Sequence, residues 1–202
     1  MVCRNRLWSG VLSLSVVLFC TAAQAQKAFH NDEISIGGFY QLTPNVTGNG
    51  ITDSTSRSGG GEAAFSHSFH PLIGWQVSYD YTRYTEFYTG QAFGYQHNVH
   101  AINGDYYVHG ARAFGFRPYA MAGATLLDFS PSLNGGQNVP YQPRAGANFG
   151  GGIEIPMLAH NFGLQLQYRG ILYKAPDFAL TKLTTGAFRL TSQPTVGIYF
   201  HF

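Results

Sequence analysis

The residues best suited to nucleophilic catalysis lie in one short segment, Ser66-His67-Ser68-Phe69-His70. A serine hydroxyl becomes a good nucleophile when a histidine within hydrogen-bond reach takes its proton. Neighbouring side chains of a β-strand point to opposite faces, so in a strand His67 faces away from both serines. His70 falls at a turn before Pro71. We therefore expect no catalytic residues here and no enzyme activity.

Two histidines have a spacing that occurs in metal sites, but the rest of a site is missing. His97 and His100 are three positions apart, which places them on opposite faces of a strand, and no cysteine accompanies them. The runs Gly59-Gly60-Gly61 and Gly150-Gly151-Gly152 lack the following helix that a phosphate-binding loop needs, and they fit close strand packing better. The sequence predicts neither a metal site nor a cofactor.

The first 25 residues are typical of a secretory signal peptide. Arg4 and Arg6 precede an apolar run from Leu7 to Phe19, and small residues follow it. We expect cleavage between Ala25 and Gln26, which leaves a mature domain of residues 26–202.

Both cysteines, Cys3 and Cys20, fall inside this expected signal, so the exported domain has no disulfide framework. A lipoprotein anchored at Cys20 is a less favoured alternative, because Phe19 stands where a small residue is typical. Without Arg4 and Arg6, 10 of the 12 basic residues remain against 10 acidic ones. This balance offers no electrostatic basis for binding nucleic acid.

Charged residues make up only 11% of the chain, whereas soluble domains average about 25%. Something other than water must therefore cover much of the surface. After the signal, no stretch approaches the roughly 20 consecutive apolar residues of a membrane-spanning helix. Abundant Gly, Tyr and Phe indicate strands instead.

Short segments with period-2 alternation, separated by Gly, Pro, Asn and Ser, predict about eight strands. Ten strands remain an alternative. The connections at 43–58, 85–96, 129–145 and 174–187 are long, and those at 70–73, 110–116 and 157–161 are short. Outer-membrane barrels have this rhythm of long extracellular loops and short periplasmic turns. The expected strands are 33–43, 59–69, 74–84, 97–109, 117–128, 146–156, 162–173 and 188–202.

Each predicted strand has one apolar face that contains no Asp, Glu, Lys or Arg. In the last strand Val196, Ile198, Phe200 and Phe202 alternate with Thr195, Gly197, Tyr199 and His201. The first strand is less regular because Phe39 falls on the polar face, and the strand from Tyr119 to Leu127 is nearly apolar on both faces. Aromatic residues near strand ends fit interfacial girdles: Phe69, Trp75, Phe129, Phe162, Tyr173 and Phe202.

Alternation alone does not tell which face is inside. A soluble lipocalin-like barrel would bury the apolar set, whereas a barrel in lipid exposes it. The shortage of charge favours the second, and the acidic and basic strand residues then point into a narrow lumen. Buried charges are costly unless they are paired, so we expect a network that closes the lumen; the alternative is a gated ion path. Its members would be Glu62, Asp80, Asp105, Glu154, Arg169 and Arg189.

Three segments of the C-terminal half resemble the bacterial outer-membrane β-barrel domain family, which includes the OmpA-like transmembrane domain and its small eight-stranded relatives. They are 118–124 (PYAMAGA), 148–154 (NFGGGIE) and 162–169 (FGLQLQYR). The N-terminal half matches only in pattern. A chain that ends in Phe202, with Phe200 and Ile198 on the same face, also looks like the signal that the outer-membrane insertion machinery reads.

The sequence thus predicts an all-β protein of the bacterial outer membrane: a closed, up-and-down, antiparallel transmembrane β-barrel. We expect a monomer surrounded by outer-membrane lipid and lipopolysaccharide, with a structural or surface-interaction role carried by long extracellular loops. A narrow porin-like channel or a small-molecule binder is the alternative. A lipid-modifying enzyme and a soluble exported barrel are less favoured, because His67 is misplaced for catalysis and charge is scarce.

Deleting Phe202 should lower the amount of folded barrel recovered from outer membranes, because the terminal aromatic residue of the proposed insertion signal is lost. The measurement is the yield of the heat-modifiable band in membrane fractions, compared with deletion of Arg57, in the predicted loop at 43–58, as a control. An unchanged membrane yield would count against the signal.

Overall fold

The computed structural model describes residues 31–132, 140–157 and 161–202. The expected signal peptide, its cleavage position between Ala25 and Gln26, and both cysteines lie outside these residues. No helix in the described part is long and apolar enough to cross a membrane.

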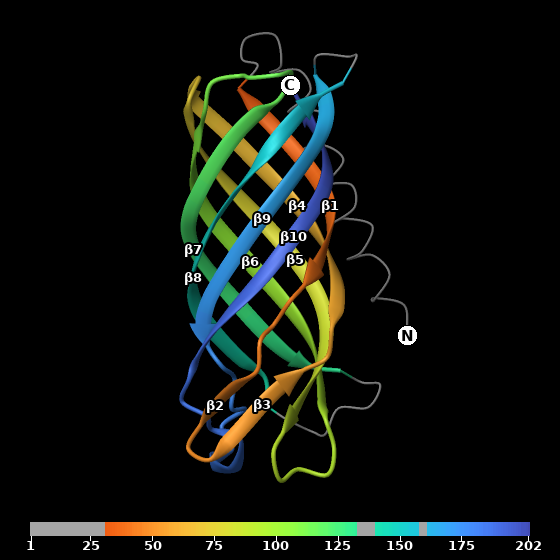
Figure 1. The fold of residues 1–202 in the computed structure, drawn as a ribbon, viewed down its shortest axis with the longest axis vertical. Helices are drawn as coiled ribbons and strands as arrows, with labels where there is room; N and C mark the ends of the chain where they lie inside the picture. Colours follow the sequence, from red (N-terminus) through yellow and green to blue (C-terminus); the bar gives the residue numbers. More distant parts are fainter. Residues whose placement is uncertain (1–30, 133–139, 158–160) are drawn as a thin grey trace, which may run out of the picture.

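Eight long antiparallel strands form a closed barrel (Figure 1). Each strand pairs with its neighbours along the chain, and β1 pairs with β10 to complete the circle. The predicted fold class is therefore confirmed, with eight barrel strands rather than ten. The strands are β1 (Asp32–Gln41), β4 (Ser58–His70), β5 (Ile73–Tyr88), β6 (Tyr95–His109), β7 (Arg117–Pro131), β8 (Gln142–Pro156), β9 (Phe162–Lys174) and β10 (Phe188–His201).

The two ends of the barrel differ. The end that carries Asp32 and His201 has short turns, such as residues 71–72 between β4 and β5. At the other end β2 (Val46–Gly48) and β3 (Ile51–Thr55) form a hairpin that pairs with the end of β5, and η2 (Thr181–Leu183) is a single 3-10 turn. We refer to these as the periplasmic and extracellular ends.

One connection predicted to be long is short. β5 continues to Tyr88 and β6 begins at Tyr95, so the expected loop at 85–96 shrinks to residues 89–94. The hairpin of β2 and β3, inside the predicted loop at 43–58, was not anticipated.

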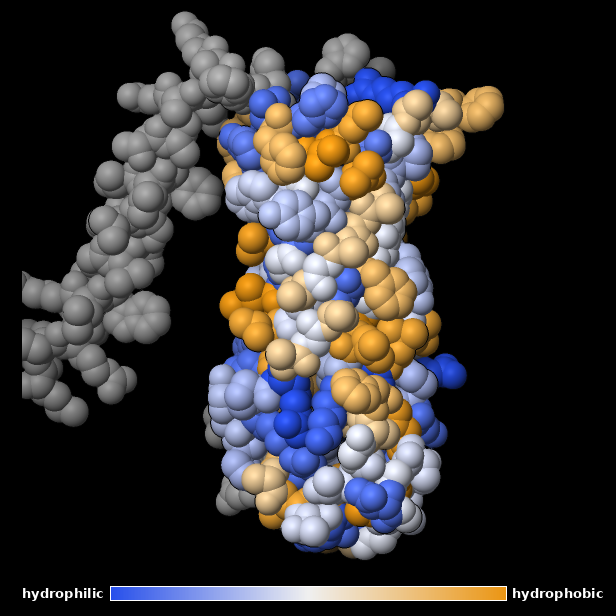
Figure 2. Space-filling model, turned by 90° about the vertical axis from the view of Figure 1, so that its left-hand side faces the viewer, coloured by the Kyte–Doolittle hydropathy of each residue, from blue (hydrophilic) through white to orange (hydrophobic). Residues whose placement is uncertain are grey.

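The wall alternates as a barrel in lipid requires, with apolar side chains outside and polar ones inside. Ile36, Ile102 and Val196 are each more than half exposed, whereas Asn103 and Thr125 are almost fully buried. Figure 2 shows apolar side chains over the wall, mixed with hydrophilic ones at the periplasmic end (top), and a large hydrophilic area toward the extracellular end (bottom). The polar interior rules out the lipocalin-like arrangement, in which the apolar face lines the interior.

The expectation that no charge faces outward is wrong at two positions of the predicted strands, and Asp32 and Lys174, just outside the predicted bounds, also have the outward phase. Arg83 on β5 and Asp128 on β7 share the outward phase of their strands. Both lie near the extracellular ends, where the wall leaves the hydrocarbon layer, and Arg83 Nε donates to Asn98 Oδ1 over 2.7 Å. Charged side chains are tolerated on the outer wall near the extracellular ends of the strands, because water and lipid headgroups surround the wall there instead of acyl chains.

The predicted aromatic girdle also needs correction. Phe129 and Tyr173 are 0% and 2% exposed and point into the lumen, because alternation continues unbroken to the ends of β7 and β9. Phe69 is 56% exposed at the periplasmic end, as a girdle residue should be.

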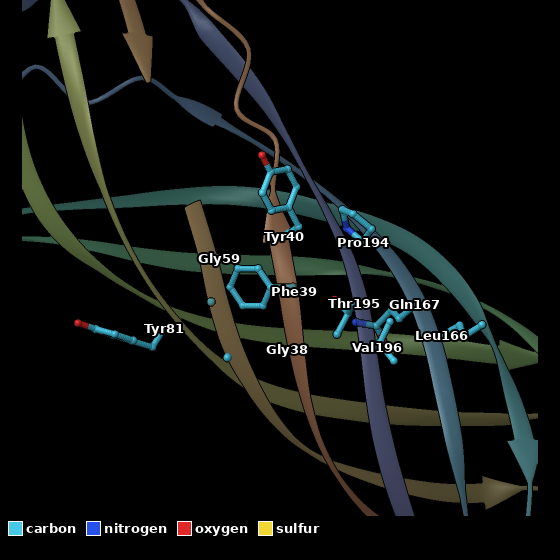
Figure 3. Close-up of a pocket in the computed structure, with 12 residues that line it drawn as sticks. Gly38, Phe39, Tyr40, Gly59, Tyr81, Leu166, Gln167, Pro194, Thr195 and Val196 are labelled. Carbon is cyan, nitrogen blue, oxygen red and sulfur yellow. The ribbon is translucent and has the colours of Figure 1, made fainter. Parts of the chain in front are cut away.

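Phe39 points inward because a glycine faces it across the strand pair. Phe39 pairs with Gly60 on β4, and a Cβ at Gly60 would overlap the Phe39 ring. The ring thus fills the lumen space that Gly60 leaves. On the outer wall, Gly38, Gly59 and Gly61 leave a shallow depression whose apolar rim includes Leu166 and Val196 (Figure 3).

The topology predicts which arginine a protease can reach on intact cells. Arg57, between β3 and β4, and Arg112, in the turn between β6 and β7, are both exposed but lie at opposite ends. Trypsin added outside should cleave after Arg57, and it should cleave after Arg112 only once the outer membrane is permeabilised. Mass spectrometry of the fragments distinguishes the two cuts. A protected Arg57 in intact cells would show that the assigned topology is wrong.

Candidate functional site

The centre of the lumen holds one arginine surrounded by three carboxylates. Arg169 on β9 is fully buried. Its Nη1 lies 2.6 Å from Glu62 Oε2 and 3.0 Å from Asp80 Oδ2, and its Nη2 lies 3.4 Å from Asp105 Oδ2. The four residues come from β9, β4, β5 and β6, so this central cluster joins strands across the lumen. Charge-assisted hydrogen bonds of this kind are about twice as strong as neutral ones.

Amide side chains donate hydrogen bonds to the same carboxylates. Asn103 Nδ2 donates to Asp80 Oδ2 over 2.8 Å, and Gln167 Nε2 lies 3.3 Å from both Glu62 carboxylate oxygens. One guanidinium cannot neutralise three carboxylates, so these donors spread the remaining negative charge. The central cluster is a polar layer that joins side chains from four strands across the lumen.

A second cluster lies near the extracellular end. Arg189 on β10 forms ion pairs with Asp53 of β3 and, over 2.7 Å, with Glu86 of β5. Glu86 also accepts a hydrogen bond from Tyr88 over 2.7 Å, and His97 Nε2 lies 3.4 Å from its carboxylate. All four ion-pairing side chains are 0% exposed. This extracellular cluster ties the β2–β3 hairpin to the barrel.

An apolar layer separates the two clusters and extends over the second. Val99, Leu127 and Ile171 line the lumen between them, and Phe178 and Leu183 from the connection before β10 are buried against the same core. The Phe178 ring packs against His97 in a tilted arrangement, with ring centroids 4.9 Å apart. The loop at 175–187 therefore covers the mouth of the barrel.

Polar contacts hold this covering loop in place. Gln142 Nε2 donates to Asp177 Oδ1 over 2.7 Å, and Gln142 Oε1 accepts from the backbone N–H of Phe178 over 2.8 Å. Arg144 Nη2 lies 3.1 Å from the same carboxylate. Burial acts to raise the pKa of Asp177, but the hydrogen bonds from Gln142 and Ala179 and the charge of Arg144 hold that pKa below its usual value. Asp177 therefore stays ionised at neutral pH.

A third cluster lies at the periplasmic mouth. His109 Nε2 is 2.7 Å from Glu154 Oε1, and His201 Nε2 is 3.3 Å from Glu33 Oε2. Arg117 approaches the other Glu154 oxygen to 3.9 Å. Tyr107, Tyr119 and Met121 form a small apolar core next to this periplasmic cluster.

The six charges predicted to form one network fall into three separate clusters. Glu62, Asp80, Asp105 and Arg169 lie together, Arg189 belongs to the extracellular cluster, and Glu154 belongs to the periplasmic one. Val99, Leu127 and Ile171 lie between the central and extracellular clusters, whereas Gln167, Tyr119 and Gln165 form a hydrogen-bonded chain from Glu62 toward the periplasmic cavity. Sequence reasoning missed their other members, which lie in predicted loops or at strand ends: Glu33, Asp53, Glu86, His109 and His201.

The side chains of residues 66–70 alternate between the lumen and the outer wall, as predicted for a strand. Ser66 Oγ donates to Gln76 Oε1 inside the lumen, whereas His67 Nδ1 is 2.7 Å from Asp32 Oδ1 on the outer wall. His97 points inward and His100 outward, where its Nδ1 is 2.6 Å from the Tyr79 hydroxyl. Ser66 therefore does not meet His67, and His97 does not meet His100.

Comparison with solved structures finds the same architecture in small barrels of the bacterial outer membrane. Neisserial surface protein A has a TM-score of 0.60 at 14% identity, over 85% of this chain and 97% of that one. The outer membrane protein OprG of Pseudomonas aeruginosa gives 0.62 at 13% identity, over 85% and 96%. The chain has the fold of the bacterial outer-membrane eight-stranded barrels.

A third neighbour is Ail, the attachment invasion locus protein of Yersinia pestis, with a TM-score of 0.51 at 16% identity over 85% of this chain and 98% of that one. No family model matches the sequence, and no curated protein does. At these identities the likeness concerns the fold. Together with the apolar wall, this fold supports the predicted location in the outer membrane.

Replacing Arg169 with Met should destabilise the outer-membrane barrel by about 3–5 kcal/mol, because three buried carboxylates lose their cation. The measurement is urea unfolding of refolded protein in lipid vesicles. Arg112→Met, on the exposed turn, serves as the control and should change stability by no more than about 0.5 kcal/mol.

Adding Glu62→Gln to the Arg169→Met variant should restore part of the loss, because one uncompensated charge is removed. Equal stability of Arg169→Met and the original chain would contradict the role of the central cluster.

Proposed function

We propose that this protein is a closed, non-catalytic outer-membrane barrel that acts through its extracellular loops, in a structural or surface-interaction role. The observation that carries the proposal is the filled lumen. Arg169 and Arg189 are both fully buried among carboxylates at two heights, and Phe178 and Leu183 cover the extracellular mouth.

The described extracellular segments support a surface role because the β2–β3 hairpin, the end of β5 and the connection at 175–187 contact one another. Asn49 Nδ2, at the tip of the β2–β3 hairpin, donates to Thr184 O over 3.1 Å, and the Tyr88 hydroxyl donates to Pro176 O over 3.0 Å. An ordered loop surface offers a partner a preformed site at lower entropic cost. Ail, whose fold is similar, is an attachment invasion locus protein, which is the kind of role that we propose here.

The apolar wall would contact the acyl chains of outer-membrane lipid and lipopolysaccharide, and the insertion machinery would be a partner during assembly. Catalysis has little support, because Ser66 and Ser68 point into the lumen while His67 is engaged with Asp32 outside. The second candidate function is a narrow cation path, which the excess of lumen carboxylates over arginines favours.

Conductance separates the two functions. Purified protein in a planar lipid bilayer should give no steady single-channel steps under voltage, and Arg112→Ala should behave in the same way. Steady steps that disappear or change size in Arg169→Ala would establish the channel instead and overturn the closed lumen.

A further inference from the structure

Three side chains of the periplasmic cluster have the composition and spacing of a metal-binding set. Glu33 on β1, Glu154 on β8 and His201 on β10 each offer one ligand atom, and these atoms lie within 4.8 Å of one another. Glu33 Oε2 and His201 Nε2 are 3.3 Å apart. Two ligands about 2.0–2.1 Å from a tetrahedral zinc ion lie about 3.3 Å apart. We propose that Glu33, Glu154 and His201 bind a divalent transition-metal ion, with Zn²⁺ as the best fit.

Unpartnered polar groups around the same cavity support a bound ion. His109 and Gln76 are 7% and 3% exposed and line this cavity together with the three proposed ligands. Within the described residues, His109 Nδ1 and Gln76 Nε2 are buried without a hydrogen-bond partner. Leaving such groups unsatisfied costs about 1–3 kcal/mol each. These unsatisfied groups show that the cavity is polar and that its described side chains leave hydrogen-bonding capacity unused.

The charge balance of the periplasmic cluster also favours a cation. Glu33 and Glu154 are both about nineteen-twentieths buried. The nearest guanidinium, Arg117, reaches Glu154 only at 3.9 Å and also donates to the backbone carbonyl of Pro71. In the central cluster, by contrast, Arg169 lies within 3.4 Å of all three carboxylates and takes the position that a metal would need. Among the described residues, the periplasmic carboxylates pair with two histidines, and their one arginine ion pair is that of Arg117 with Glu154.

The donor types indicate which ion fits. Two carboxylates and one imidazole, with His109 2.7 Å from Glu154, suit Zn²⁺, whereas Mg²⁺ and Ca²⁺ prefer oxygen ligands alone. His109 would hold and orient Glu154, as neighbours of metal-binding carboxylates commonly do.

The proposed site lies close to the periplasmic surface. His201 lines both the inner cavity and an open depression on the rim that includes His70 and Arg112. Its side chain is 28% exposed, so an incoming ion meets His201 first. The site does not depend on the state of the extracellular loops.

Metal binding to the refolded, untagged protein in detergent tests the proposal. After chelator treatment and dialysis, titration calorimetry should find one Zn²⁺ per barrel, and Co²⁺ should give the visible absorption of a tetrahedral site. His201→Asn and Glu154→Gln should each weaken Zn²⁺ binding at least tenfold. His70→Asn changes an exposed histidine on the same rim and should bind like the original chain.

Folding is checked first by the heat-dependent shift in gel mobility, and only folded protein is titrated. His201→Asn sits at the rim, so it gives a result even where Glu154→Gln does not fold. The proposal is overturned if the original chain takes up no Zn²⁺. It is also overturned if His201→Asn binds unchanged, or if His70→Asn abolishes binding.

Discussion

The pairing of β1 with β10 is the constraint on which the rest of this structure depends. In hydrocarbon an unpaired backbone N–H or C=O costs several kcal/mol, so a sheet can cross the membrane only when it closes on itself. Closure with eight strands leaves an interior just wide enough for side chains. Everything that points inward must therefore pack against, or hydrogen-bond with, what points inward from the opposite wall.

That narrow interior explains why its charges occur in layers. A buried arginine is stable only with carboxylates in contact, and the strands can bring such partners together only at equal heights. Arg169 meets Glu62, Asp80 and Asp105 at one height, and Arg189 meets Asp53 and Glu86 at another. Between them Leu127 and Ile171 line the lumen together with polar side chains such as Thr82. Each arginine thus finds its ion-pair partners at its own height in the lumen.

The strands could be predicted from the sequence because hydrocarbon selects the outward residue at every second position. Beyond the membrane the outward residues no longer need to be apolar, so the sequence pattern no longer marks a strand. For this reason the sequence predicts loops at Glu86 and Asp53, although both lie in strands. Alternation itself does not stop there: Arg83 keeps the outward phase of Tyr81, and Tyr173 keeps the inward phase of Ile171. Which inward charges meet could not be derived, because strand pairing fixes neighbours but not contacts across the lumen.

The two mouths of the barrel are built differently, and this difference limits what each can exchange. The extracellular mouth is covered by Phe178 and Leu183, and removing them from the core would expose apolar surface to water. The periplasmic mouth is lined by Glu33, Glu154 and His201, and His201 is partly exposed. Polar groups at this mouth can exchange protons, water or ions without unfolding any packed element. The periplasmic mouth is therefore suited to exchange with small solutes. The extracellular end is suited to contacts between its described loops and a partner.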